Sequence, residues 1–182
     1  MTSPEKDTHL IEAKVSGQRV FEGHLLKINC DTVSLPDGEL AKREYVEHPG
    51  AVMVIPVLDD GRLLMERQYR YPLHQVFVEF PAGKLDPGED PLTCGKRELL
   101  EETGYSAVEW EYLGVFHPLI SYSSEVIHLF LARGLTAGQP NRDEEEFLEI
   151  VPMSLDTLKA GILANEITDS KTIAGVFWLM NR

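Results

Sequence analysis

The sequence is poor in cysteine, in positive charge and in long apolar runs. Among its 182 residues only Cys30 and Cys94 are cysteines. Two are too few for a disulfide framework, so we expect ordinary reduced thiols. No apolar stretch approaches the length of a membrane span, and the opening MTSPEKDTHLIEAKV lacks the apolar core of a signal peptide. We therefore expect a cytoplasmic protein without a membrane partner.

Positive charge is scarce, with 17 lysines and arginines against 30 aspartates and glutamates and a formal net charge of −13. Such an acidic chain lacks the basic surface of a general nucleic-acid binder, so we expect no nucleic-acid partner. An acidic enzyme can still bind an anionic diphosphate if metal ions bridge the two, so the charge is compatible with metal dependence. The length corresponds to one domain with a sizeable core.

Apolar and β-branched patterning predicts strands on both sides of a central helix, with two helices at the end. Strands are predicted at 20–35 (as a pair), 43–48, 51–58, 62–69, 76–80, 109–116, 125–132 and 146–152. Residues 1 to about 14 are polar and predicted to be loose. This order indicates a mixed α/β domain.

The two C-terminal helices are predicted from capping residues and apolar spacing. Ser154 caps the first, and either Asp169 or Ser170 caps the second. Four residues of the first are expected to share an apolar face: Leu155, Leu158, Ile162 and Leu163. The second is apolar at Ile173, Val176, Phe177 and Met180.

A central helix is predicted over 91–103, within the segment GKLDPGEDPLTCGKRELLEETGY that spans 83–105. Asp90 can accept hydrogen bonds as the N-cap, and Pro91 suits the first helical position. Leu92 and Leu99, seven residues apart, lie on a face suited to core packing.

Three carboxylates of this helix, Glu98, Glu101 and Glu102, are three or four residues apart and so crowd one face. Like charges repel unless a cation or a hydrogen-bonding partner compensates. Oxygen-rich carboxylate sites are what Mg2+ prefers, particularly beside substrate phosphates. Glu98 and Glu102 are the candidate metal ligands and Glu101 is a third candidate for the catalytic cluster. The alternative is a solvated acidic helix.

The segment resembles the Nudix box, the signature of hydrolases that act on a nucleoside diphosphate linked to another group. Its seven specified identities are Gly83, Glu89, Arg97, Glu98, Glu101, Glu102 and Gly104. Leu99 fills the first apolar position, whereas Tyr105 is aromatic where an aliphatic residue is commoner. The resemblance implies a Nudix α/β/α sandwich with a mixed sheet at 49–182, preceded by an N-terminal antiparallel β-region at 1–48.

The resemblance also implies a metal site that binds Mg2+, with Mn2+ as an alternative. Beside Glu98 and Glu102 it adds the backbone carbonyl of Ala82 as a ligand. Gly83 would then permit close backbone approach, although a simple turn glycine is an equally good local explanation. Arg97 is expected to pair with Glu89 and brace the loop, with direct phosphate contact as the alternative.

A second acidic cluster, Asp143-Glu144-Glu145-Glu146, precedes a predicted strand. Alone it is typical of a charged loop. Beside a Nudix box it resembles the late catalytic loop of ADP-ribose pyrophosphatases. That resemblance makes Glu146 a further metal ligand and Glu144 the general base, or the reverse. A glutamate is already ionised at neutral pH and can accept a proton where the geometry is right.

Further segments resemble the ADP-ribose and nucleotide-sugar branch: 42–52, 67–72, 78–89, 125–132 and 166–172. In that branch the arginine matching Arg70 contacts the diphosphate, and a glutamate matching Glu79 lies close to the substrate. Arg43 matches a residue that reaches the nucleotide across a dimer interface. The resemblance therefore implies a homodimer with exchanged N-terminal regions.

The expected reaction is metal-dependent hydrolysis of ADP-ribose to AMP and ribose 5-phosphate. One departure concerns the substrate, because Ile120 stands where ADP-ribose pyrophosphatases usually have a proline. GDP-mannose or another nucleotide sugar is the alternative. A second class, modules that sense ADP-ribose without cleaving it, typically loses box glutamates and carries a DNA-binding domain. This chain keeps every glutamate.

Overall fold

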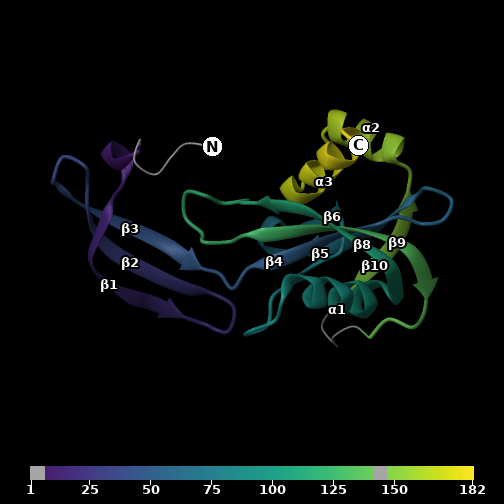
Figure 1. The fold of residues 1–182 in the computed structure, drawn as a ribbon, viewed down its shortest axis with the longest axis horizontal. Helices are drawn as coiled ribbons and strands as arrows, with labels where there is room; N and C mark the ends of the chain where they lie inside the picture. Colours follow the sequence, from purple (N-terminus) through teal and green to yellow (C-terminus); the bar gives the residue numbers. More distant parts are fainter. Residues whose placement is uncertain (1–6, 142–146) are drawn as a thin grey trace. The chain divides into compact units, whose positions relative to one another are not determined.

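The computed structural model describes residues 7–141 and 147–182 (Figure 1). They form two compact units. The first extends to His48 and includes Leu119–Glu125, and the second comprises Pro49–Pro118 and Val126–Arg182.

The first unit is a three-stranded antiparallel sheet in the order β1-β2-β3, preceded by a short 3-10 helix. Its elements are η2 (Thr8–Leu10), β1 (Ala13–Glu22), β2 (Lys27–Ser34) and β3 (Leu40–Glu47). This confirms the antiparallel β-region. Helix η2 and the start of β1 lie where a loose segment was predicted, and that prediction was wrong there. Every residue of β1 is exposed, so backbone pairing with β2, not an apolar pattern, makes it a strand.

The second unit holds a mixed sheet in the order β7-β4-β9-β8 and an antiparallel sheet in the order β10-β5-β6. The mixed sheet comprises β4 (Ala51–Pro56), β7 (Ala82–Lys84), β8 (Tyr105–Phe116) and β9 (Ile127–Ala137). The antiparallel sheet comprises β5 (Leu63–Arg70), β6 (Gln75–Glu79) and β10 (Leu148–Met153). The helices are η3 (Tyr71–Leu73), α1 (Pro91–Thr103), α2 (Leu155–Leu163) and α3 (Ser170–Met180). The mixed α/β class is confirmed.

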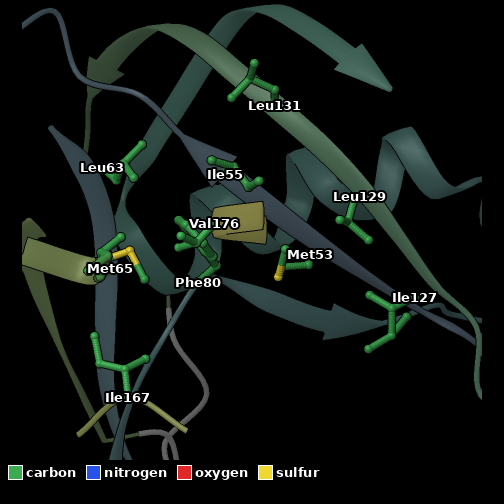
Figure 2. Packing of buried hydrophobic residues seen from close by; sticks show 12 residues of the cluster. Met53, Ile55, Leu63, Met65, Phe80, Ile127, Leu129, Leu131, Ile167 and Val176 are labelled. Carbon is green, nitrogen blue, oxygen red and sulfur yellow. The ribbon is translucent and has the colours of Figure 1, made fainter. Parts of the chain in front are cut away.

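The core of this unit is divided by β4, whose six residues are all buried. Met53 and Ile55 face one cluster, which includes residues of α2 and α3 (Figure 2). Val52 and Val54 face another, shared with α1. Helix α1 therefore covers one face of the mixed sheet, and α2 and α3 lie on the other side, as Figure 1 shows. Burial of alternate residues on both faces explains the continuous apolar run of this strand.

Both predicted C-terminal helices form. Ser154 caps α2, and Asp169, not Ser170, caps α3. Leu158 of α2 is fully buried, but Leu163 is 88 % exposed, so the prediction that it shares the core face was wrong. These two leucines are five positions apart, which puts them on different sides of a helix with 3.6 residues per turn. In the described ranges, no helix combines the length and apolarity needed to cross a membrane.

Candidate active site

Helix α1 begins and ends where the sequence predicts. The Asp90 carboxylate accepts hydrogen bonds from the backbone N–H groups of Leu92 and Thr93, each at 3.1 Å. Gly104 ends the helix in the left-handed conformation, with φ of 77°. Leu99 is fully buried, and it anchors the helix against the mixed sheet. These contacts fix the direction of the acidic face in the last turns.

The short strand β7 places Ala82 and Gly83 beside that acidic face. It pairs with β4, the central buried strand. Glu102 Oε2 accepts a hydrogen bond from the Ala82 N–H at 3.1 Å. A Cβ on Gly83 would lie 1.8 Å from the carboxyl carbon of Glu98. Since Gly83 does not have a positive φ, it is required for close approach and not for a turn, which decides between the two explanations.

Arg97 gathers the carboxylates of the box. Its Nε and Nη2 donate to the two oxygens of Glu89 at 2.9 and 2.8 Å. Its Nη1 donates to Glu98 at 2.8 Å and to Glu101 at 3.1 Å. The predicted pairing of Arg97 with Glu89 is confirmed. One guanidinium thus faces three carboxylates, and a fixed fork of donors holds them in a defined geometry.

The environment of this cluster shifts the pKa values of its members in the expected directions. Hydrogen bonds from Arg97 lower the pKa of Glu89 to about 2. Hydrogen bonds to Glu89 in turn raise the pKa of Arg97. Burial raises the pKa of the Cys94 thiol to about 12, so this cysteine stays protonated. Cys30 and Cys94 are both free, as predicted.

A second charged cluster is built around Glu79, whose side chain is only 3 % exposed. Arg70 donates to it from Nε at 2.8 Å and from Nη2 at 2.7 Å. Lys171 of α3 also donates to Glu79, and lies 3.1 Å from Asp169. These four residues line a cavity of about 320 Å3, together with Leu73 and Phe77. The structure thus brings together Arg70 and Glu79, both predicted from the sequence, and adds Lys171.

Electrostatic coupling connects this second cluster to α1. Burial alone would raise the pKa of Glu79, but Arg70 and Lys171 outweigh it, so the pKa lies below its ordinary value. The hydrogen bonds to Glu79 raise the pKa of Arg70, and the negative charges of Glu102 and Asp169 add to that shift. Arg70 therefore lies within electrostatic range of a carboxylate of the box.

Comparison with known proteins identifies this arrangement. Residues 47–174 match the family model described as the NUDIX domain. The chain belongs to the Nudix family. A "Methanol dehydrogenase activator" of Bacillus methanolicus is 41 % identical over 170 residues, 92 % of each chain. An "ADP-ribose pyrophosphatase" of Bacillus subtilis is 37 % identical over 172 residues, 93 % of each chain. A protein of Mycobacterium tuberculosis with that same name is 34 % identical, covering 89 % of this chain and 80 % of its own.

These relatives confirm the branch of Nudix hydrolases indicated by the sequence. A solved structure described as an "ADP compounds hydrolase" has a TM-score of 0.83 over 94 % of both chains, at 23 % identity. That likeness confirms the Nudix fold. The chain is accordingly a Nudix hydrolase, with the Glu98, Glu101 and Glu102 side chains on its box helix.

Two carboxylates beside Gly83 supply oxygen atoms of the kind that bind a divalent cation. The carboxylates of Glu98 and Glu102 meet the same two-residue stretch of backbone, Ala82–Gly83, and oxygen donors of this kind suit Mg2+. Within residues 7–141 and 147–182, no three histidine, cysteine or acidic side chains gather closely enough to hold an ion. Here Glu98 and Glu101 are both directed to Arg97.

Three further residues were predicted as site residues. Glu144 and Glu146 are outside the described residues. Arg43 lies on β3 of the first unit, where its Nε donates to Glu12 at 2.8 Å and that carboxylate raises the pKa of Arg43. Sequence reasoning missed Lys171, although it lies in the segment 166–172 that resembles the family. No local spacing connects it to Glu79, 92 positions earlier.

Proposed function

We propose that this Nudix hydrolase cleaves the diphosphate of a nucleoside diphosphate sugar in a metal-dependent reaction, with ADP-ribose as the preferred substrate. The observation that carries the proposal is the approach of Glu98 and Glu102 to the Ala82–Gly83 backbone. The negative charge of Glu102 also contributes to the raised pKa of Arg70. Relatives named ADP-ribose pyrophosphatase, similar over most of the chain, support the substrate.

Glu98, Glu102 and the carbonyl of Ala82 would hold the ion, together with Glu146. When bound, Mg2+ or Mn2+ stabilises negative charge on the diphosphate oxygens and lowers the pKa of a coordinated water. Arg97 keeps Glu98 in place through its bond of 2.8 Å and fixes Glu101, a third candidate for this cluster, at 3.1 Å. Carboxylates held in this way would bind the cation at a limited cost in conformational freedom.

The substrate is held by Arg70, which donates hydrogen bonds to the diphosphate, and Glu79 orients that guanidinium. Glu144 removes a proton from the attacking water, or Glu146 does so if their roles are exchanged. One P–O bond of the anhydride breaks as the water oxygen forms another, so ADP-ribose and water give AMP and ribose 5-phosphate. Arg97 takes no part in this exchange beyond holding Glu98 and Glu101, the latter a third candidate for the catalytic cluster.

A homodimer and a cytoplasmic location belong to the same proposal. The N-terminal region, residues 1–48, would exchange between subunits and bring Arg43 to the partner's nucleotide. The hydrogen bond between Arg43 and Glu12 would then have to break. Light scattering of the purified protein tests the dimer, and a monomer at micromolar concentration would contradict it. The two free cysteines are consistent with a reducing compartment, which cell fractionation would test.

GDP-mannose is a second candidate substrate because Ile120 replaces the proline usual in ADP-ribose pyrophosphatases. Ile120 is 84 % exposed, so its side chain is free to contact a ligand. A sensing module without catalysis is disfavoured by the complete set of box glutamates.

The test is incubation of the purified protein with ADP-ribose, GDP-mannose and oxidised nucleoside triphosphates, each with Mg2+ and with a chelator. AMP release from ADP-ribose that requires the metal is the expected result. Faster cleavage of GDP-mannose would select the second candidate. Tight ADP-ribose binding without turnover of any compound would instead indicate a sensor, and Glu102→Gln serves as the inactive control.

A further inference from the structure

Glu79 is a buried carboxylate held between two cations that come from distant parts of the chain. Arg70, at the end of β5, supplies two donors, and Lys171, in the first turn of α3, supplies another. The side chain of Arg70 is 42 % exposed, whereas that of Lys171 is 13 % exposed. Arg70 is therefore the cation that a ligand in the cavity can reach, and Lys171 is the inner one.

The two hydrogen bonds between Arg70 and Glu79 present a difficulty for substrate binding. A guanidinium that turns toward a diphosphate must give up part of its contact with Glu79. Removing one partner of a buried ion pair leaves an uncompensated charge, which is strongly destabilising. If Arg70 were the only cation on Glu79, this cost would oppose its transfer to the substrate.

We infer that Lys171 is a positioning residue which holds the charge of Glu79 and so lets Arg70 share its guanidinium with the diphosphate. The inference rests on the proposed function, because it needs a diphosphate that Arg70 binds. Lys171 donates to Oε2, whereas Arg70 donates to both oxygens. Glu79 thus keeps a cation on one oxygen when Arg70 turns.

Lys171 is well fixed for this role. Asp169, 3.1 Å from the Lys171 ammonium, also accepts a hydrogen bond from the Thr172 N–H as the cap of α3. The fully buried Thr172 hydroxyl accepts a hydrogen bond from the Phe80 N–H at 3.1 Å. Phe80 directly follows Glu79, so the start of α3 is tied to the residue beside the carboxylate that Lys171 neutralises.

The charge balance of the cluster predicts opposite effects on KM for substitutions at Lys171 and Asp169. Arg70 and Lys171 carry two positive charges, and Glu79 and Asp169 carry two negative ones. Loss of the Lys171 charge leaves a negative cluster that holds Arg70 and repels a diphosphate. Loss of the Asp169 charge leaves a positive cluster. Asparagine caps a helix as well as aspartate does, so Asp169→Asn keeps the cap of α3.

The experiment compares Lys171→Met, Lys171→Arg and Asp169→Asn with the wild type in Mg2+-dependent hydrolysis of ADP-ribose. We expect Lys171→Met to raise KM by about tenfold or more, with kcat changed by less than about threefold. Lys171→Arg should restore most of the loss, because it keeps the charge. Asp169→Asn keeps an oxygen that can accept hydrogen bonds from Lys171 and the Thr172 N–H but loses the negative charge, so KM should fall. Thermal melting checks that each variant is folded.

Two results would overturn the inference while the wild type remains active. One is a folded Lys171→Met with the KM of the wild type. The other is a rise in KM in Asp169→Asn, where loss of a negative charge predicts a fall; such a rise would show that any change at the start of α3 has this effect. The second criterion stands even if Lys171→Met does not fold. A wild type that cleaves none of the nucleotide sugars would overturn the proposed function as well.

Discussion

Replacing Gly83 by alanine probes the closest contact in the candidate site. The added Cβ would lie 1.8 Å from the carboxyl carbon of Glu98 and 1.9 and 2.2 Å from its oxygens, whereas ordinary contact begins at 3.4 Å. The carboxylate must therefore move by roughly 1.5 Å, which takes Glu98 out of position as a ligand. Because a misplacement of about 1 Å can cost about a hundredfold in rate, we expect kcat to fall at least that far.

The same substitution should leave the fold intact. Gly83 does not have a positive φ, so alanine fits its backbone. Loss of glycine also removes freedom from the unfolded chain, which stabilises by about 0.4–1 kcal/mol and offsets part of the disturbance around Glu98. We expect the free energy of unfolding, measured in urea, to change by less than about 1 kcal/mol.

Gly61→Ala is the matched control because it is expected to lower stability and leave activity unchanged, the reverse of Gly83→Ala. Gly61 has φ of 83° with no atom near its missing Cβ, so alanine should cost about 1–2 kcal/mol of stability. Its turn lies outside the box, and activity should be that of the wild type. Steady-state hydrolysis of ADP-ribose with Mg2+ is the assay. A Gly83→Ala enzyme with normal kcat would refute the reasoning.

Three other predictions concern the same helix and its loop. Glu102→Gln removes a proposed ligand and should lower turnover by at least about a hundredfold with an unchanged melting temperature; near-normal turnover in the steady-state assay would remove Glu102 from the ligand set. Because Arg97 lowers the pKa of Glu89 from 4.5 to about 2, the folded protein keeps Glu89 ionised where the unfolded chain takes up protons. The stabilisation is full above about pH 5 and is lost as the pH falls toward 2. The difference in unfolding free energy between wild type and Glu89→Gln should therefore shrink across that range. A difference that stays constant from neutral to acidic pH would contradict this. Asp90→Ala removes the N-cap and should cost about 1 kcal/mol in urea denaturation, whereas Asp90→Asn should cost little, and equal losses in both would show that the cap contributes nothing.

The structural features best predicted from the sequence are those determined by residues close together in the chain. Asp90, Pro91 and Gly104 set the bounds of α1 through capping, which depends on backbone groups within one turn. The apolar run at 51–58 predicted a buried strand, and the strand Ala51–Pro56 is buried on both faces. The pairing of Arg97 with Glu89 followed from the family pattern and is present.

What the sequence did not predict depends on contacts between distant segments. Strand β7 has three residues and no strand pattern, and it forms because β4 offers backbone partners. Strand β8 begins at Tyr105 and β9 continues to Ala137 because they pair with each other beyond the predicted ranges 109–116 and 125–132. Lys171 reaches Glu79 only once α3 is tied to Phe80. No periodic pattern in the sequence predicts these contacts between distant segments.

The most direct test of the account is an anomalous diffraction experiment on crystals containing Mn2+ and a non-hydrolysable ADP-ribose analogue. We expect an Mn2+ peak bound by the carboxylates of Glu98 and Glu102 and the carbonyl of Ala82, in contact with the diphosphate. A diphosphate bound elsewhere, or a peak that touches neither glutamate, would contradict it.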